Sequence, residues 1–275
     1  MKVLWFRLML TLLTTTVAFG QLQQRMAQAP AAAAPAAATD CFATLTSGSG
    51  PTAFNFCVTR NGNVLSLESP AGAEHIRVGV FMEGYAICDH TLGLRYWDLG
   101  DYSPNGTFSA PTITQPNGPN TLPLTITRNT WDSIYTLKQT FSRNVQDRSV
   151  LVTMSLTNND ITFTGNRSVS FWRAADFDVD GNFFNWGAAT SDTAMAWNNV
   201  NATTAPGHGG ALQSLSLNIP HSAGVVPFGV GDPACPDFRD VGWPRIDDVV
   251  TYVGHDFLIT GKHQTKTATV KLRVF

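Results

Sequence analysis

The chain has 275 residues and carries 18 basic against 20 acidic side chains, which gives a net charge of −2 at neutral pH. This balance excludes the strongly basic face that nucleic-acid binding requires. Of the acidic residues 17 are Asp and 3 are Glu, and the chain has 5 Lys. Because Asp favours turns whereas Glu and Lys favour helices, the charged composition argues against a helical protein.

Residues 1–20 have the features of a secretory signal peptide. Lys2 and Arg7 provide a basic start, and Ala18 and Gly20 are the small residues of a cleavage site. The apolar run between them has about a dozen residues, too few to cross a bilayer. Cleavage would leave 16 basic and 20 acidic side chains, a net charge of −4. We therefore expect a secreted or periplasmic protein, with no later apolar run long enough to span a membrane.

Residues 21–39 consist mostly of Ala, Gln and Pro and are typical of a flexible linker. The folded domain is expected to span residues 40–275. Its four cysteines form an even number, which favours disulfides in an exported chain. Three pairings are possible, and we prefer Cys41–Cys57, which would close a short hairpin, with Cys88–Cys235 joining distant parts. A cysteine metal site is disfavoured because no C-x-x-C pair exists.

Apolar and polar residues alternate in many short segments of this domain. A clear example is the segment VLVTMSLT at residues 150–157, and "HIRVGVFM", "PLTITRN", "NRSVSFWR" and "VVTYVGHDF" also read as strands. Turn sequences such as "SPNG", "QPNGPN" and "VDGN" separate them. The pattern predicts an all-β domain, a large antiparallel two-sheet sandwich of about 12 to 16 strands.

Two segments carry a resemblance to a known class of fold. "NGNVLSLESPAGAEHI" (residues 61–76) resembles the opening of galactose-mutarotase-like supersandwich domains, and residues 123–160 are similar in their long paired strands. The segment "NRSVSFWRAADFDVDGN" (residues 166–182) also resembles uncharacterised exported bacterial β-sandwich proteins. The resemblance implies a supersandwich, often with a carbohydrate groove. Mutarotases of this class use a late Glu as base, whereas no Glu follows Glu83 here.

An aspartate-rich stretch, "DFDVDGN", is the strongest candidate site. Asp176, Asp178 and Asp180 alternate before Gly181 and Asn182, which matches the first half of an oxygen-rich calcium loop. The stretch is not an EF-hand, because Gly187 stands where a bidentate Glu is required. We predict a calcium site formed by Asp176, Asp178, Asp180 and Asn182, with Asn185 or Asp192 as further candidate ligands.

A simpler interpretation is a hairpin with a type I′ turn at Asp180–Gly181 and solvated carboxylates on one strand face. Three like charges on one face repel each other unless a cation or an arginine screens them, and Arg173 is the nearest candidate. A catalytic role for the aspartates is a third interpretation.

Other candidate ligand-binding residues lie in polar or glycine-rich surroundings. Tryptophan rings suit the apolar faces of sugars, and glycines allow a ligand to approach the backbone closely. The candidates are Trp97, Asp98, Asp101, Trp186 and His208.

The sequence favours a calcium-stabilised exported sandwich that binds carbohydrate or another extracellular partner, and it leans away from an enzyme. The alternative is a polysaccharide hydrolase or lyase that uses Asp178 or Asp180 together with Asp98 or Asp101. The sequence does not indicate an oligomeric state.

Overall fold

The computed structural model describes residues 40–48, 54–69, 73–77, 83–100, 106–144, 147–198, 209–228, 235 and 245–275. The predicted signal peptide and linker, residues 1–39, lie outside this part of the chain, as do Asp101 and His208. Within the described residues, no helix is long and apolar enough to cross a membrane.

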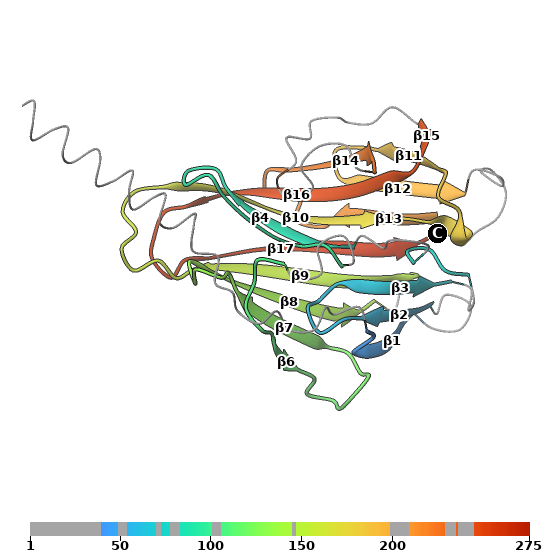
Figure 1. Ribbon diagram of the computed structural model, residues 1–275, viewed down its shortest axis with the longest axis horizontal. Helices are drawn as coiled ribbons and strands as arrows, with labels where there is room; N and C mark the ends of the chain where they lie inside the picture. Colours follow the sequence, from blue (N-terminus) through green and yellow to red (C-terminus); the bar gives the residue numbers. More distant parts are fainter. Residues whose placement is uncertain are drawn as a thin grey trace, which may run out of the picture. The chain divides into compact units, whose positions relative to one another are not determined.

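The described residues form 17 strands in three antiparallel sheets, one strand above the predicted range of about 12 to 16. A small sheet has the order β1-β2-β3, a five-stranded sheet the order β14-β16-β10-β4-β5, and a nine-stranded sheet the order β15-β11-β12-β13-β17-β9-β8-β7-β6. Neighbouring strands of the nine-stranded sheet run side by side in Figure 1. Strands β6 and β15 have only three residues each. Such segments are too short for the alternation of apolar and polar residues to reveal them.

The 17 strands are divided among the three sheets as follows. The five-stranded sheet contains β14 (His221–Pro227), β16 (Val249–Ile259), β10 (Arg167–Asp176), β4 (Glu83–Asp89) and β5 (Leu94–Asp98). The nine-stranded sheet contains β15 (Arg245–Asp247), β11 (Asn185–Ala189), β12 (Thr193–Asn198), β13 (Gly209–Ser214), β17 (Thr265–Val274), β9 (Ser149–Asn158), β8 (Tyr135–Arg143), β7 (Leu124–Asn129) and β6 (Thr112–Thr114). The small sheet contains β1 (Ala43–Ser47), β2 (Phe54–Val58) and β3 (Val64–Glu68).

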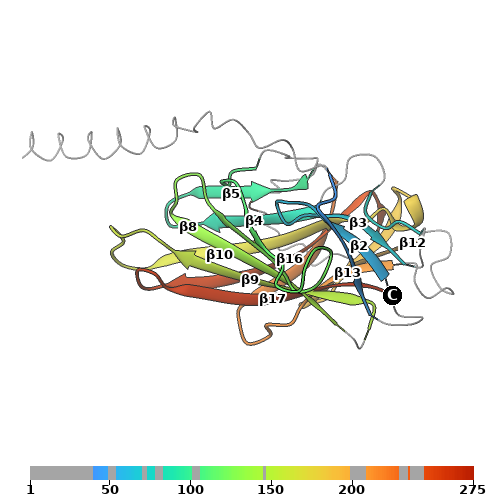
Figure 2. The ribbon, with the colours of Figure 1, turned by 90° about the horizontal axis from the view of Figure 1, so that it is seen from below.

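The two larger sheets face each other across a common apolar core, and Figure 2 shows β4 and β10 running across β9 and β17. Strand β9 illustrates the cause, because Val150, Val152, Met154 and Leu156 are fully buried while the residues between them are partly exposed. The all-β sandwich is thus confirmed. A second, smaller apolar cluster lies on the outer side of the five-stranded sheet and includes Trp172 and Tyr252.

Two disulfides join the chain, Cys41–Cys57 and Cys88–Cys235, as the preferred pairing predicts. The first joins Cys41, which lies two residues before β1, to Cys57 of the paired strand β2. The second connects β4 to a segment 147 residues later in the sequence. Disulfides of this kind are typical of oxidising compartments outside the cytosol.

Two ion pairs are buried between the sheets. Arg173 of β10 contacts Glu83 at 2.6 Å, and both side chains are fully buried. Arg128 of β7 contacts Asp98 of β5, and this guanidinium also donates to the hydroxyl of Tyr85. Burial is the largest influence on the two carboxyl groups and raises the pKa of both, while the neighbouring arginines lower it. These pairs are part of the core and are not open to solvent.

Candidate metal centre

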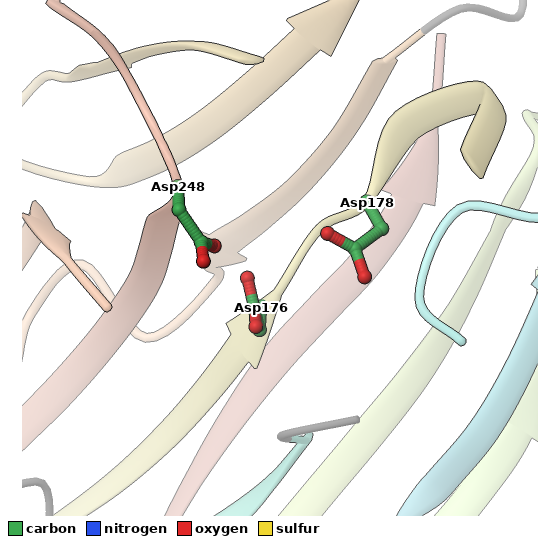
Figure 3. Close-up of side chains that lie close together, drawn as sticks. All are labelled: Asp176, Asp178 and Asp248. Atoms are coloured by element: carbon green, nitrogen blue, oxygen red, sulfur yellow. The ribbon is translucent and has the colours of Figure 1, made fainter. Parts of the chain in front are cut away.

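Three aspartates from two segments of the chain meet at one end of the five-stranded sheet. Asp176 is the last residue of β10, Asp178 follows two residues later, and Asp248 lies between β15 and β16. The antiparallel register pairs Asp176 with Val250, so Asp248 stands two residues from the partner of Asp176. One carboxylate oxygen from each lies within 4.8 Å of the others. Figure 3 shows the three carboxylates turned toward a shared space.

Strand alternation explains why these side chains share one side of the sheet. Ala175, Phe177 and Val179 belong to the core between the sheets, so the residues that alternate with them face outward. The ring of Phe177 fixes this stretch against β13, because a Cβ atom on Gly210 would lie only 2.4 Å from it. A glycine at position 210 is therefore required for this close approach.

The carboxylates of Asp176 and Asp248 receive little compensation from the described residues around them. Asp176 is 4% exposed and Asp178 is 1% exposed. Oδ1 of Asp176 and Oδ1 of Asp248 are buried and accept no hydrogen bond from the described residues. None of the ion pairs within the described residues includes Asp176 or Asp248. Arg173, which the sequence offers as a screening cation, binds Glu83 on the opposite side of the sheet.

Burial and mutual repulsion act on the protonation of this cluster. Burial, followed by the charges of Asp178 and Asp248, raises the pKa of Asp176 to about 9. Burial and then the charge of Asp247 raise the pKa of Asp248. A carboxylate group with these properties is stabilised either by taking up a proton or by binding a cation.

Asp180 and Asn182, the other two predicted ligands, make different contacts. The backbone of Asp180 has φ 58° and that of Gly181 has φ 73°, and the N–H of Asn182 donates to the carbonyl of Val179 at 3.2 Å. The predicted turn at Asp180–Gly181 is thus present. It does not close a hairpin, because it connects β10 of one sheet to β11 of the other.

The side chains of this turn are bound within the protein. The carboxylate of Asp180 accepts a hydrogen bond from Asn198, and Oδ1 of Asn182 accepts one from the backbone N–H of Phe184 at 3.1 Å. Asp180 is not part of the group of three facing carboxylates. The assignment of Asp180 and Asn182 as ligands therefore stays a prediction.

Of the two further candidate ligands, Asn185 contacts the aspartate stretch directly. Its amide nitrogen donates to the carbonyls of Phe177, at 2.8 Å, and Asn182. Its Oδ1 is buried and accepts no hydrogen bond from the described residues. Asp192, the other candidate, binds His221 at 3.0 Å instead.

The sequence reasoning missed Asp248. The only local signal is the pair of aspartates at 247–248 directly before the strand pattern "VVTYVGHDF". Its position beside Asp176 depends on the pairing of β10 with β16, two strands about 80 residues apart, which periodicity alone does not reveal.

The predicted ligand-binding residues within the described part do not form one site. Trp97 is partly buried and packs against the apolar cluster on the outer side of the five-stranded sheet. Asp98 is buried against Arg128 between the sheets. Trp186 is on β11 of the nine-stranded sheet, stacked on Trp197. The roles of these residues stay predictions.

A second group of polar side chains lies between β13, β14 and β16. The hydroxyl of Ser214 is 2.9 Å from Nε2 of His255, and His255 is 6.0 Å from His221, measured between ring centroids. Ser214 is 1% exposed and His255 is fully buried, so the pair is shielded from any substrate. Burial, and then the charge of His221, lowers the pKa of His255 to about 4.

This depressed pKa predicts a loss of stability in acid. Unfolded His255 takes up a proton near pH 6.5 whereas the folded one resists until about pH 4. Stability is therefore fully present above pH 6.5 and falls through that window, by at most about 3 kcal/mol. Burial lowers the pKa of His221, but its contacts with the Ile219 carbonyl and with Asp192 raise this pKa by more. Protonation of His221 therefore stabilises the folded protein as the pH falls, opposite to the effect of His255.

Urea unfolding at pH 7 and pH 4.5 tests this for the wild type and for His255→Gln. We expect the wild type to lose more stability than the variant between the two pH values. Equal losses would show that His255 does not titrate as its surroundings suggest.

Comparison with known proteins gives a fold but no family. No protein-family model matches the chain, and no curated protein matches it. A bacterial glucoamylase solved with acarbose is similar over 86% of this chain, with a TM-score of 0.60 and 10% identity. The chain spans 32% of the length of that enzyme.

Two further solved structures are similar at lower scores. A heparan sulfate lyase from Pedobacter heparinus has a TM-score of 0.43 and 11% identity, over 84% of this chain and 35% of that one. A galactose mutarotase related enzyme from Lactobacillus acidophilus has a TM-score of 0.41 and 6% identity, over 84% of this chain and 97% of that one. The mutarotase-like resemblance noted in the sequence therefore reappears among the solved structures. At these identities the similarity describes the fold.

Proposed function

We propose that the chain is an exported sandwich protein that is stabilised by a calcium ion and binds carbohydrate. The observation that carries the calcium proposal is the group of three facing carboxylates of Asp176, Asp178 and Asp248. Two of their oxygens are buried and accept no hydrogen bond from the described residues. A cation would remove the repulsion that raises the pKa of Asp176.

The donor atoms favour calcium over other metals. The group contains carboxylate oxygens and no His or Cys, which argues against zinc and copper. Calcium takes six to eight oxygens at about 2.3–2.6 Å in flexible geometry, so backbone carbonyls and water can complete the shell. Asn185 could add its free amide oxygen. Asp176, Asp178 and Asp248 would neutralise the ion and fix the two segments that carry them.

Two partly exposed tryptophans and the fold support the carbohydrate part of the proposal. Trp186 and Trp197 are partly exposed on the nine-stranded sheet, and such rings suit the apolar faces of sugars. The fold shared with a glucoamylase makes carbohydrate the first class of ligand to test. The two disulfides support export.

A polysaccharide hydrolase is the second candidate, and the raised pKa of Asp176 is the observation that favours it. A protonated Asp176 beside the second carboxyl group of Asp178 would supply the pair of groups that an acid and a base require. One oxygen of each lies within 4.8 Å of the other, and retaining glycosidases hold their two carboxyl groups roughly 5–5.5 Å apart. Asp98, a partner considered from the sequence, is buried against Arg128 instead. The same carboxylates would either bind a cation or catalyse hydrolysis. Measurements of cation binding and of activity on polysaccharides therefore distinguish the two candidate functions.

Thermal unfolding in EDTA and in millimolar Ca²⁺ tests the proposal. A ligand at 100 times its Kd adds about 2.7 kcal/mol, which corresponds to roughly 5–10 °C for a domain of this size. We expect this increase for the wild type and its loss in Asp248→Asn. Asp256→Asn, the same change at an exposed position of β16, serves as the control and should respond like the wild type.

Two results would count against the calcium site. One is a wild-type midpoint that is the same in EDTA and in Ca²⁺. The other is an increase that persists unchanged in Asp248→Asn. Either result would make activity assays on polysaccharides, with an Asp176→Asn control, the next step.

A further inference from the structure

An apolar surface lies on the outer face of the nine-stranded sheet. Phe184 is 58% exposed and Ile246 is 46% exposed, whereas large apolar side chains are usually covered. Ile246 pairs with Trp186 across β15 and β11, and Trp186 pairs with Trp197 across β11 and β12. Trp197 in turn pairs with Gly209 of β13.

The next ring in this row comes from Phe275. A Cβ atom on Gly209 would lie 2.5 Å from the Phe275 ring, so this ring covers the glycine. Ile246, Trp186, Trp197 and Phe275 thus form a continuous row across four strands, here called the aromatic ridge. With strands about 4.8 Å apart, the row is roughly 14 Å long.

The ridge faces outward. Ala194 and Ala196 of β12 belong to the core between the sheets, and Trp197 alternates with them. Both indoles are partly exposed. Their planes are parallel within 10° and their centroids are 6.2 Å apart. Because stacked carbon atoms touch at about 3.5–4.0 Å, the two rings are offset by roughly 5 Å, and neither covers the other's face completely.

The charged side chains of β17 nearest the ridge are already engaged. Further along the same outer face, hydroxyl groups of β9 and β17 pair across the strands as Thr153–Thr269, Ser155–Thr267 and Thr157–Thr265. Lys271 binds Asp147 at 3.0 Å, and Arg273 lies over the Phe275 ring. Aromatic faces whose neighbouring charges on β17 are engaged, with neutral hydroxyl groups further along the sheet, suit a neutral sugar better than an acidic one.

We propose that the aromatic ridge binds a neutral polysaccharide, with sugar rings packed against the indoles of Trp186 and Trp197. The inference rests on the proposed function, because it names the surface and the class of carbohydrate. Apolar C–H faces of the sugar cover the rings, and its hydroxyl groups bond to polar side chains around them. The row is long enough to contact successive sugar rings.

The proposed cation site is connected to the ridge by two short stretches of the chain. Asp178 precedes Trp186 by eight residues, and Asp248 follows Ile246 by two. Asn185, next to Trp186, bonds to the carbonyl of Phe177 between two of the aspartates. A cation bound by Asp176, Asp178 and Asp248 would fix both segments, so sugar binding is expected to be tighter in Ca²⁺ than in EDTA, and calcium binding tighter with sugar present.

Affinity gel electrophoresis tests the proposal with four neutral polysaccharides and an acidic one: mixed-linkage β-glucan, xylan, galactomannan, amylose and polygalacturonate. The variants are Trp197→Ala and the double change Trp186→Ala/Trp197→Ala. Leu258→Ala removes an exposed apolar side chain from the five-stranded sheet, away from the ridge, and is the control. Trp197→Phe keeps an aromatic ring, and thermal unfolding of each variant checks that it folds.

We expect at least one neutral polysaccharide to retard the wild type and Leu258→Ala. Binding by the double variant should be roughly tenfold weaker or more, with Trp197→Phe in between. Equal retardation of all folded variants would overturn the ridge while leaving carbohydrate binding intact. Retardation by polygalacturonate alone would overturn the neutral class. No retardation by any polymer would overturn the ridge and the carbohydrate part of the proposed function, whereas the calcium part depends on the melts.

Discussion

Replacing Arg173 by Met is expected to destabilise the protein by about 3–5 kcal/mol, because it leaves the fully buried Glu83 without its cation. The guanidinium also donates to Gln139, at 2.7 Å, and to the carbonyl of Gly62, at 3.2 Å. Both acceptors would lose a donor in the core. The free energy of unfolding in urea measures the loss.

A double variant separates the ion pair from the loss of packing. Arg173→Met/Glu83→Gln removes the buried charge and keeps an oxygen that can accept the N–H of Val64. It should be less destabilised than Arg173→Met alone. Arg95→Met makes the same change at an exposed position of β5 and is expected to alter stability by about 0.5 kcal/mol or less. A loss in Arg173→Met no larger than in Arg95→Met would contradict the role of the buried pair.

Asp176→Asn is expected to have opposite effects with and without calcium. In EDTA the folded wild type keeps a proton on Asp176 up to about pH 9, while the unfolded chain releases it near pH 4. Wild-type stability therefore falls as pH rises through this window. Asparagine carries no such proton, so the variant should be more stable than the wild type at pH 7, by up to about 4 kcal/mol.

In millimolar Ca²⁺ the order should be reversed or the difference removed, because Asn supplies a neutral oxygen where the ion needs a carboxylate. Urea unfolding of both proteins in EDTA and in Ca²⁺ measures all four values. An Asp176→Asn variant that is less stable than the wild type in EDTA would mean that the cluster is not strained without a cation. An equal response of both proteins to Ca²⁺ would mean that Asp176 is not a ligand.

Much of the fold follows from local patterns in the sequence. Period-two alternation, as in β9 and β17, predicts the sandwich because each strand buries one side and exposes the other. The pairing Cys41–Cys57 follows from a short hairpin, and it leaves Cys88 for Cys235. The turn at Asp180–Gly181 follows from residues that tolerate positive φ.

The buried charges could not be predicted in this way. Strand β4 is buried along its whole length although it begins with Glu83, and Arg173 lies in β10, which is buried except at Ser168. A charged residue in a strand pattern normally indicates a solvent-facing position. Only the pairing of β4 with β10, which are far apart in sequence, brings Glu83 and Arg173 together on the core side of one sheet. The interpretation of Arg173 as a partner of the aspartates was therefore wrong.

The candidate site could be predicted in part. Asp176 and Asp178 share one side because they alternate with core residues, which the sequence pattern already indicates. Asp248 joins them through the pairing of β10 with β16, and no local signal gives that register. Trp97 and Trp186 have similar polar, glycine-containing surroundings in sequence but belong to different sheets. Sequence context alone does not reveal to which sheet each of the two tryptophans belongs.

A crystal structure of the protein grown with Ca²⁺ is the most direct test of the calcium site. We expect one ion, identified by its anomalous signal, with oxygens of Asp176, Asp178 and Asp248 at about 2.3–2.6 Å. A structure in which these carboxylates share only protons and water, at millimolar Ca²⁺, would contradict this expectation.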